Sequence, residues 1–140
     1  MSHTVFQLHS QLESDTSMVI DLPLCRVLLM HDKQFPWLIL VPRRENCKEL
    51  YDLAEQDITI YQQESLLVSK ALMKGFNGDK LNVAALGNMV PQLHIHHIVR
   101  FKKDIAWPKP VWGTQPAIPY AETEQLNMLE KMRTLLQAFT

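Results

Sequence analysis

The chain has 140 residues, enough for one domain that buries most of its surface around a single core. Hydrophobic residues make up 46% of it and charged residues 21%, a balance typical of globular proteins, and the formal net charge of -1 lacks the basic excess of a general nucleic-acid binder. The chain has no apolar run of 18 residues and no apolar signal-peptide stretch, so we expect a cytoplasmic protein without a membrane partner.

Hydrophobic periodicity and turn residues predict the elements that precede the longest helix. They are a short helix over residues 4–14 and strands over residues 18–21, 25–30 and 37–41. The polar residues 32–34 are typical of a turn, which makes a hairpin of the last two strands. Pro42 is expected to end this hairpin because it has no N–H to offer a neighbouring strand.

The second half of the chain contains the longest helical pattern. Leu67 and Ala71 belong to an apolar stripe on a helix over residues 57–76, and Thr59 with Gln62 resembles a capping box. The other predicted elements are a helical turn within 46–54, strands over 80–85 and 90–101, an irregular segment over 107–113 and an amphipathic helix over 121–139. This order predicts the α+β class with a mostly antiparallel sheet.

The two cysteines and the two N-terminal histidines show no motif spacing. Cys25 falls in an expected core strand and Cys47 in a polar turn, so we expect both thiols to be reduced. His3 and His9 are expected to be surface residues.

Residues 92–100 are the most informative segment, because they place three histidines within four positions of an expected strand. Side chains of a strand alternate between its two faces. Gln92, His94 and His96 therefore share one face, and His97 lies among the apolar residues of the other. A row of polar groups on a strand anchored in a core indicates binding or chemistry.

Three explanations fit this row of side chains. The first is a metal site, although the third ligand, from His31, Glu45 or Asp104, would come only by accident of folding. The second is a nucleophilic imidazole that attacks phosphorus, its tautomer fixed by a backbone carbonyl, with the turn at Gly87 and Asn88 offering N–H groups to a phosphate. The third is the solvated face of an ordinary sheet.

Residues 87–98, Gly-Asn-Met-Val-Pro-Gln-Leu-His-Ile-His-His-Ile, resemble the signature of the histidine triad (HIT) superfamily. That signature alternates three histidines with apolar residues after a glycine turn, and the resemblance extends over about residues 18–102. The segments around 35–37 and 106–113 resemble a bacterial subgroup of HIT-like hydrolases. The resemblance implies a single α+β domain over residues 1–140, a homodimer, and a nucleotide as the small-molecule partner. It also implies hydrolysis or transfer of nucleoside monophosphate groups, with a non-catalytic nucleotide-binding module as the alternative.

The resemblance also assigns roles to individual residues. His94 would be the nucleophile that forms a nucleotidyl-histidine, and His96 would lie beside the leaving group and help to move its proton. Gln92 falls on the first triad position, where glutamine can orient His94 or contact a phosphate oxygen but cannot titrate. No metal or other cofactor is expected.

The remaining expected nucleotide contacts are Asn82, Gly87, Asn88 and His31, the last standing where the family has an asparagine beside the ribose. Two further pairs of residues allow more than one interpretation. Arg43 and Arg44 are either phosphate ligands or exposed basic residues, and we favour the second. Trp107 and Trp112 either line the substrate pocket or pack the tail and a dimer contact.

Overall fold

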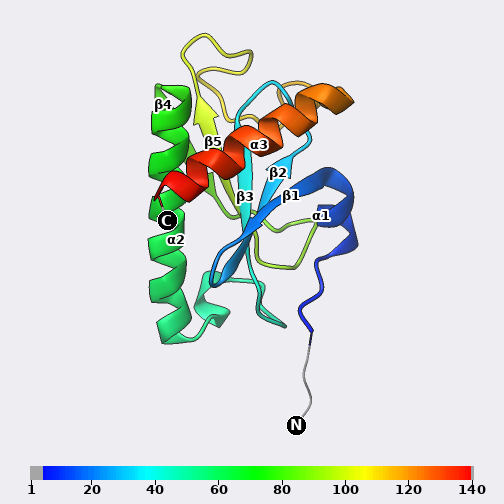
Figure 1. The fold of residues 1–140 in the computed structure, drawn as a ribbon. Helices are drawn as coiled ribbons and strands as arrows, with labels where there is room; N and C mark the ends of the chain where they lie inside the picture. The colour runs from blue at the N-terminus through cyan, green and yellow to red at the C-terminus, as the bar shows by residue number, and fades with distance from the viewer. Residues whose placement is uncertain (1–4, 140) are drawn as a thin grey trace.

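A five-stranded sheet forms the centre of the computed structural model, which describes residues 5–139 (Figure 1). Its strands are β1 (Thr16–Asp21), β2 (Cys25–Met30), β3 (Trp37–Pro42), β4 (Lys80–Ala84) and β5 (Ile95–Arg100). Their order in the sheet is β1-β2-β3-β5-β4, and every neighbouring pair is antiparallel. The prediction of an α+β fold with an antiparallel sheet is confirmed.

The two long helices, α2 (Glu55–Phe76) and α3 (Glu122–Phe139), cover one face of the sheet (Figure 1). The opposite face packs against the short helix α1 (Ser10–Asp15) and the irregular segment that follows β5. Strands β3 and β5 are buried along their whole length because both faces at the centre of the sheet are covered. The histidines of β5 therefore divide between a helical layer and an irregular layer.

Helix α2 begins at Glu55, two residues before the predicted start, and its N-cap is Ala54. The predicted capping box is wrong, since Thr59 lies in the second turn and its hydroxyl donates to the carbonyl of Glu55. The helix ends at Phe76, and its C-cap, Asn77, adopts the left-handed conformation with φ 51°. The helical turn expected within 46–54 is a 3-10 turn, Leu50–Asp52.

The segment that carries the histidines enters the sheet later than predicted. Strand β5 begins at Ile95 rather than at residue 90. Pro91 has no N–H to pair with a strand, and the N–H of Leu93 donates to the carbonyl of Cys47 instead of to a strand neighbour. His94 therefore lies one residue before β5 begins. The alternation of side chains between the two faces of a strand does not fix the direction of its side chain.

Smaller differences concern the N-terminal segment and the strand ends. Helix α1 covers only Ser10–Asp15, residues 5–9 are not helical, and residue 4 of the predicted helix lies outside the described residues. Strand β1 begins two residues early, and Pro42 remains in β3 opposite Cys25 at the end of the ladder. Cys25 and Cys47 are both free and buried, and burial raises the pKa of each thiol. Within residues 5–139, neither long helix is apolar enough to cross a bilayer.

Candidate functional site

The ring of His94 is oriented by its own backbone. Its Nδ1 lies 2.7 Å from the carbonyl oxygen of Gln92, an oxygen that can only accept a hydrogen bond. Nδ1 therefore carries the ring proton, and Nε2 of the neutral ring keeps a free lone pair. The side chain is 7% exposed, so solvent or a ligand reaches one edge of the ring.

His96 has the opposite tautomer. The indole Nε1–H of Trp37 donates to Nδ1 of His96 over 3.0 Å, so Nδ1 accepts and the ring proton lies on Nε2. Burial, with smaller contributions from His94 and His97, lowers the pKa of His96 to about 3. The ring remains neutral at ordinary pH and offers one N–H donor.

The two rings lie edge to face, with centroids 5.2 Å apart and planes at 74°. Both line a cavity of about 680 Å³ on the face of the sheet away from α2 and α3. A free lone pair and an N–H donor therefore border the same space. This pairing suits attack on an electrophile whose charge grows on oxygen.

His97 lies in the core, on the face of the sheet that α2 covers. Its Nδ1–H donates to the carbonyl of Ile95 over 3.1 Å, and its Nε2 lies 2.8 Å from the hydroxyl of Ser65 on α2. The side chain is fully buried, and burial lowers its pKa to about 4. The sequence placed His97 among the apolar residues of its strand, and the structure confirms that position.

Comparison with known proteins defines the family. The family model of the HIT domain matches residues 11–103. The chain belongs to the HIT family. The structure is similar to that of a histidine triad protein from Marinobacter aquaeolei VT8, with 49% sequence identity and a TM-score of 0.93, over 98% of this chain and 100% of that chain. A histidine triad protein from Bradyrhizobium japonicum is 44% identical, with a TM-score of 0.92 over 95% of this chain and 99% of that chain.

A third histidine triad protein, from Sinorhizobium meliloti 1021, is 40% identical with a TM-score of 0.89, over 92% of this chain and 96% of that chain. The comparison with curated proteins gave no match. The sequence-based assignment to the superfamily is therefore confirmed.

Gln92, at the first triad position, does not line the cavity with the other two triad residues. Its side-chain oxygen accepts the backbone N–H of His9 over 2.8 Å, and its side-chain nitrogen donates to the carbonyl of Gln7 over 3.0 Å. Only its backbone carbonyl serves the triad, through the bond to His94. The side chain thus faces the N-terminal segment.

The N-terminal segment forms one wall of the cavity through His9, Gln11 and Asp15. His9 is therefore not the plain surface residue that the sequence suggested, while His3 lies outside the described residues. No sequence signal pointed to His9, because its contact to Gln92 joins positions 83 residues apart.

Gly87 and Asn88 also line the cavity. Gly87 has a positive φ of 72°, which a residue with a Cβ adopts only at a cost, so the turn depends on glycine. Both residues are exposed, and their backbone is open to a ligand. Leu86, Met89 and Val90 add an apolar patch to this wall.

Asn82 and His31 do not reach the cavity. The side-chain oxygen of Asn82 accepts a 2.8 Å hydrogen bond from the guanidinium of Arg100. His31 lies 2.7 Å from the hydroxyl of Ser17, which also accepts from Gln125 of α3, so it faces the helical layer. The lining of this cavity therefore gives no support to the direct nucleotide contacts expected for these two residues.

Arg100 is a buried charged residue at the end of β5. It lies on the same face of β5 as His96, almost completely buried, and forms an ion pair with Asp104 at 2.9 Å. Burial opposes ionisation of this carboxyl, but hydrogen bonds from Arg100 and from two backbone N–H groups hold the pKa of Asp104 below its ordinary value. The ring of Trp107 packs on the guanidinium at 5.8 Å.

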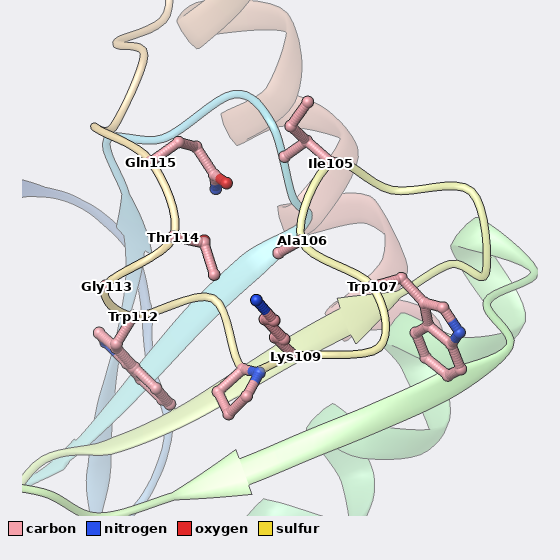
Figure 2. Close-up of a pocket in the computed structure, with 9 residues that line it drawn as sticks. Ile105, Ala106, Trp107, Lys109, Trp112, Gly113, Thr114 and Gln115 are labelled. Atoms are coloured by element: carbon pink, nitrogen blue, oxygen red, sulfur yellow. The ribbon is translucent and has the colours of Figure 1, made fainter.

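Trp112 lines the cavity, whereas Trp107 does not. The ring of Trp112 meets those of His96 and Trp37 edge to face, with centroids 5.0 Å and 5.9 Å away. Figure 2 shows Trp112 and Trp107 on opposite sides of Lys109, around a second cavity of about 520 Å³ that shares Trp112. Trp112 thus packs against the triad residue His96, and Trp107 packs against Arg100.

The two arginines after β3 are engaged within the protein. Arg43 donates to the carbonyls of Leu22, Pro23 and Leu24. Arg44 pairs with Asp57 at 2.7 Å. Neither lines the triad cavity, so the phosphate-ligand interpretation gains no support.

The metal-site alternative lacks a ligand set. Among residues 5–139, no group of three or more histidine, cysteine, aspartate or glutamate side chains is arranged to hold a metal ion. Of the suggested third ligands, Asp104 is bound to Arg100 and His31 faces the helical layer.

Proposed function

We propose that this HIT protein binds a nucleotide and cleaves nucleoside phosphate derivatives through a nucleotidyl intermediate on His94. The observation that carries the proposal is the 2.7 Å hydrogen bond from Nδ1 of His94 to the carbonyl of Gln92. It leaves a lone pair on Nε2 of a ring that lines the cavity. A neutral imidazole nitrogen is a good nucleophile towards phosphorus.

The reaction then has two displacements. Nε2 of His94 forms a bond to the α-phosphorus while the bond from phosphorus to the leaving-group oxygen breaks, and the leaving group takes the electron pair. Water next forms a bond to the same phosphorus while the bond from phosphorus to Nε2 breaks. The electron pair of that bond returns to Nε2, one proton of the water passes to the solvent, and nucleoside monophosphate is freed. The backbone at Gly87 and Asn88 is open to the non-bridging oxygens, where fixed donors stabilise growing negative charge.

His96 contributes a hydrogen bond rather than a proton. Its Nδ1 is occupied by the indole of Trp37, so its N–H can stabilise a departing oxygen, but giving up that proton would leave an imidazolate. This replaces the expectation that His96 moves the leaving-group proton. Substrates whose leaving group departs as a stable anion, such as dinucleoside polyphosphates, fit the site better than phosphoramidates, whose amine must be protonated.

The test is capture of the intermediate. Wild-type protein, mixed with a dinucleoside polyphosphate labelled at the α-phosphorus and quenched in denaturant, should retain label that acid releases. His94→Ala should retain none and release no nucleoside monophosphate. His31→Ala, a histidine change in the helical layer, is the control and should behave as wild type.

A non-catalytic nucleotide-binding module gives a different result. It would bind nucleotide with and without His94, trap no label and show no turnover in the wild type. That outcome would end the catalytic proposal and leave the binding proposal standing.

We propose in addition that the chain is a cytoplasmic homodimer formed by a single domain. Support for pairing is the position of β4 at the edge of the sheet, with Val83 and, just beyond it, Leu86 and Met89 exposed. A molar mass of one chain, measured by light scattering at micromolar concentration, would exclude the dimer.

A further inference from the structure

Both ends of the side-chain amide of Gln92 bond to one short stretch of the N-terminal segment. Its oxygen accepts from the N–H of His9 at 2.8 Å, and its nitrogen donates to the carbonyl of Gln7 at 3.0 Å. A primary amide presents an acceptor and a donor side by side, whereas the two nitrogens of an imidazole point in diverging directions. Glutamine at this position therefore matches the backbone of residues 7–9 in a way that histidine cannot.

The residue fixed by this pair of bonds is His9. It caps helix α1, and its Nδ1 accepts the backbone N–H of Gln11 over 3.0 Å. Nδ1 is therefore unprotonated, and the ring proton lies on Nε2. Because His9 lines the cavity together with His94 and His96, Nε2–H is the polar group that its ring can offer to a ligand there.

The same wall also carries a negative charge. Asp15 lines the cavity, and the side chain of Gln11 donates to its carboxylate at 2.9 Å. A carboxylate repels a phosphate, and the amide of Gln11 gives one of its two N–H groups to that carboxylate, which holds the amide beside the negative charge. The ring N–H of His9 is therefore the better placed donor for an anionic ligand on this wall.

We propose that His9 supplies the third imidazole of the site and donates a hydrogen bond to a phosphate of the bound nucleotide, with Gln92 as the positioning residue that holds it there. The inference rests on the proposed function and assigns to residues 9 and 92 together the place of the first triad histidine. These two hydrogen bonds join residues 7–9 to the segment that carries the triad.

The variant that isolates the imidazole is His9→Asn, because asparagine is a good N-cap and keeps the backbone N–H that Gln92 binds. Steady-state kinetics on a dinucleoside polyphosphate should show a fall in kcat/KM of roughly 10- to 100-fold, the worth of one hydrogen bond to a charged group. The melting temperature should stay within about two degrees of wild type.

Gln92→Ala tests the positioning role through a double-mutant cycle. If Gln92 acts through His9, the single change lowers kcat/KM, and adding it to His9→Asn lowers kcat/KM no further. Gln62→Ala, on the exposed surface of α2, is the matched glutamine control and should leave the kinetics unchanged.

The outcomes separate cleanly. If His9→Asn equals wild type while His94→Ala is inactive, the role of His9 is refuted and the proposed function survives. If His94→Ala retains turnover, the proposed function itself fails. If the losses of His9→Asn and Gln92→Ala multiply in the double variant, Gln92 does not act through His9, and a parallel fall in melting temperature would make its role purely structural.

Discussion

The indole N–H of Trp37 and the Nδ1 of His96 form a 3.0 Å hydrogen bond between neighbouring strands, and this bond decides what the third triad histidine can do. It places the ring proton on Nε2, towards the cavity, and removes the second site at which the ring could take up a proton. The positions that it joins are 59 residues apart in the sequence.

Replacement of Trp37 by phenylalanine should widen the range of leaving groups. The indole donor is lost, and the smaller ring lets water reach Nδ1 of His96, which reduces the burial that lowers the pKa of His96. Nδ1 then becomes free to accept a proton, and His96 gains the capacity to act as a general acid. We expect the rate on a nucleoside phosphoramidate, relative to a dinucleoside polyphosphate, to rise at least about tenfold, within the usual contribution of acid catalysis. Trp107→Phe, outside the cavity, is the control. An unchanged ratio in Trp37→Phe would contradict the tautomer argument.

A second prediction separates a hydrogen-bond donor from a proton donor at position 96. The amide of His96→Gln still offers an N–H, whereas His96→Ala offers none. On a dinucleoside polyphosphate we expect His96→Gln to retain about tenfold more kcat/KM than His96→Ala. Equal losses in both variants, read from initial rates at pH 7, would show that a titrating group is needed there.

The sequence predicts the fold well, because its apolar runs and helical stripes are local signals. The hairpin of β2 and β3 and the long helices were found within a few residues. The late start of β5 was missed because it depends on where the N–H of Leu93 finds its partner, the carbonyl of Cys47, a contact between distant segments. Alternation alone cannot reveal such a contact.

The candidate site was predictable only in part. The motif identified His94, His96, Gly87 and Asn88, which the fold brings to one cavity. Asn82 lies on the strand that the sequence predicts, but no sequence signal indicates that buried Arg100 binds it. The contribution of the N-terminal segment also escaped prediction, because it depends on tertiary hydrogen bonds rather than on residue spacing.

The buried histidines should make the protein sensitive to acid. The pKa of His97 falls from its ordinary 6.5 to about 4, and that of His96 to about 3, so between pH 6.5 and 4 the unfolded chain binds protons that the folded chain does not. Stability is therefore fully present above pH 6.5 and falls as the pH drops, by about 1.4 kcal/mol per pH unit for each such site. His97→Gln should lower by one the number of protons taken up on unfolding, and so reduce the slope of the unfolding free energy against pH. Urea unfolding at several pH values measures this slope. A slope equal to that of wild type would mean that His97 does not titrate on unfolding.

The ion pair of Arg100 and Asp104 should contribute far more to stability than the surface pairs of this chain. Asp104 accepts from Arg100 at 2.9 and 3.1 Å and also from the backbone N–H groups of Phe101, Ala106 and Trp107, all beneath the segment that leads to Trp112. Removing one partner of a buried pair leaves an uncompensated charge, so Asp104→Ala should lower the free energy of unfolding by about 3–5 kcal/mol.

The matched comparison is Asp21→Ala, which breaks the more exposed pairs with Arg26 and Arg43 and should cost about 1 kcal/mol. Because the Asp104 hydrogen bonds also hold the start of the segment that places Trp112 against His96, Asp104→Ala should raise KM for nucleotide at temperatures where the variant is still folded. Chemical denaturation and steady-state kinetics at 15 °C test both effects. Similar unfolding free energies for the two variants would show that the buried pair is no more important than a surface one.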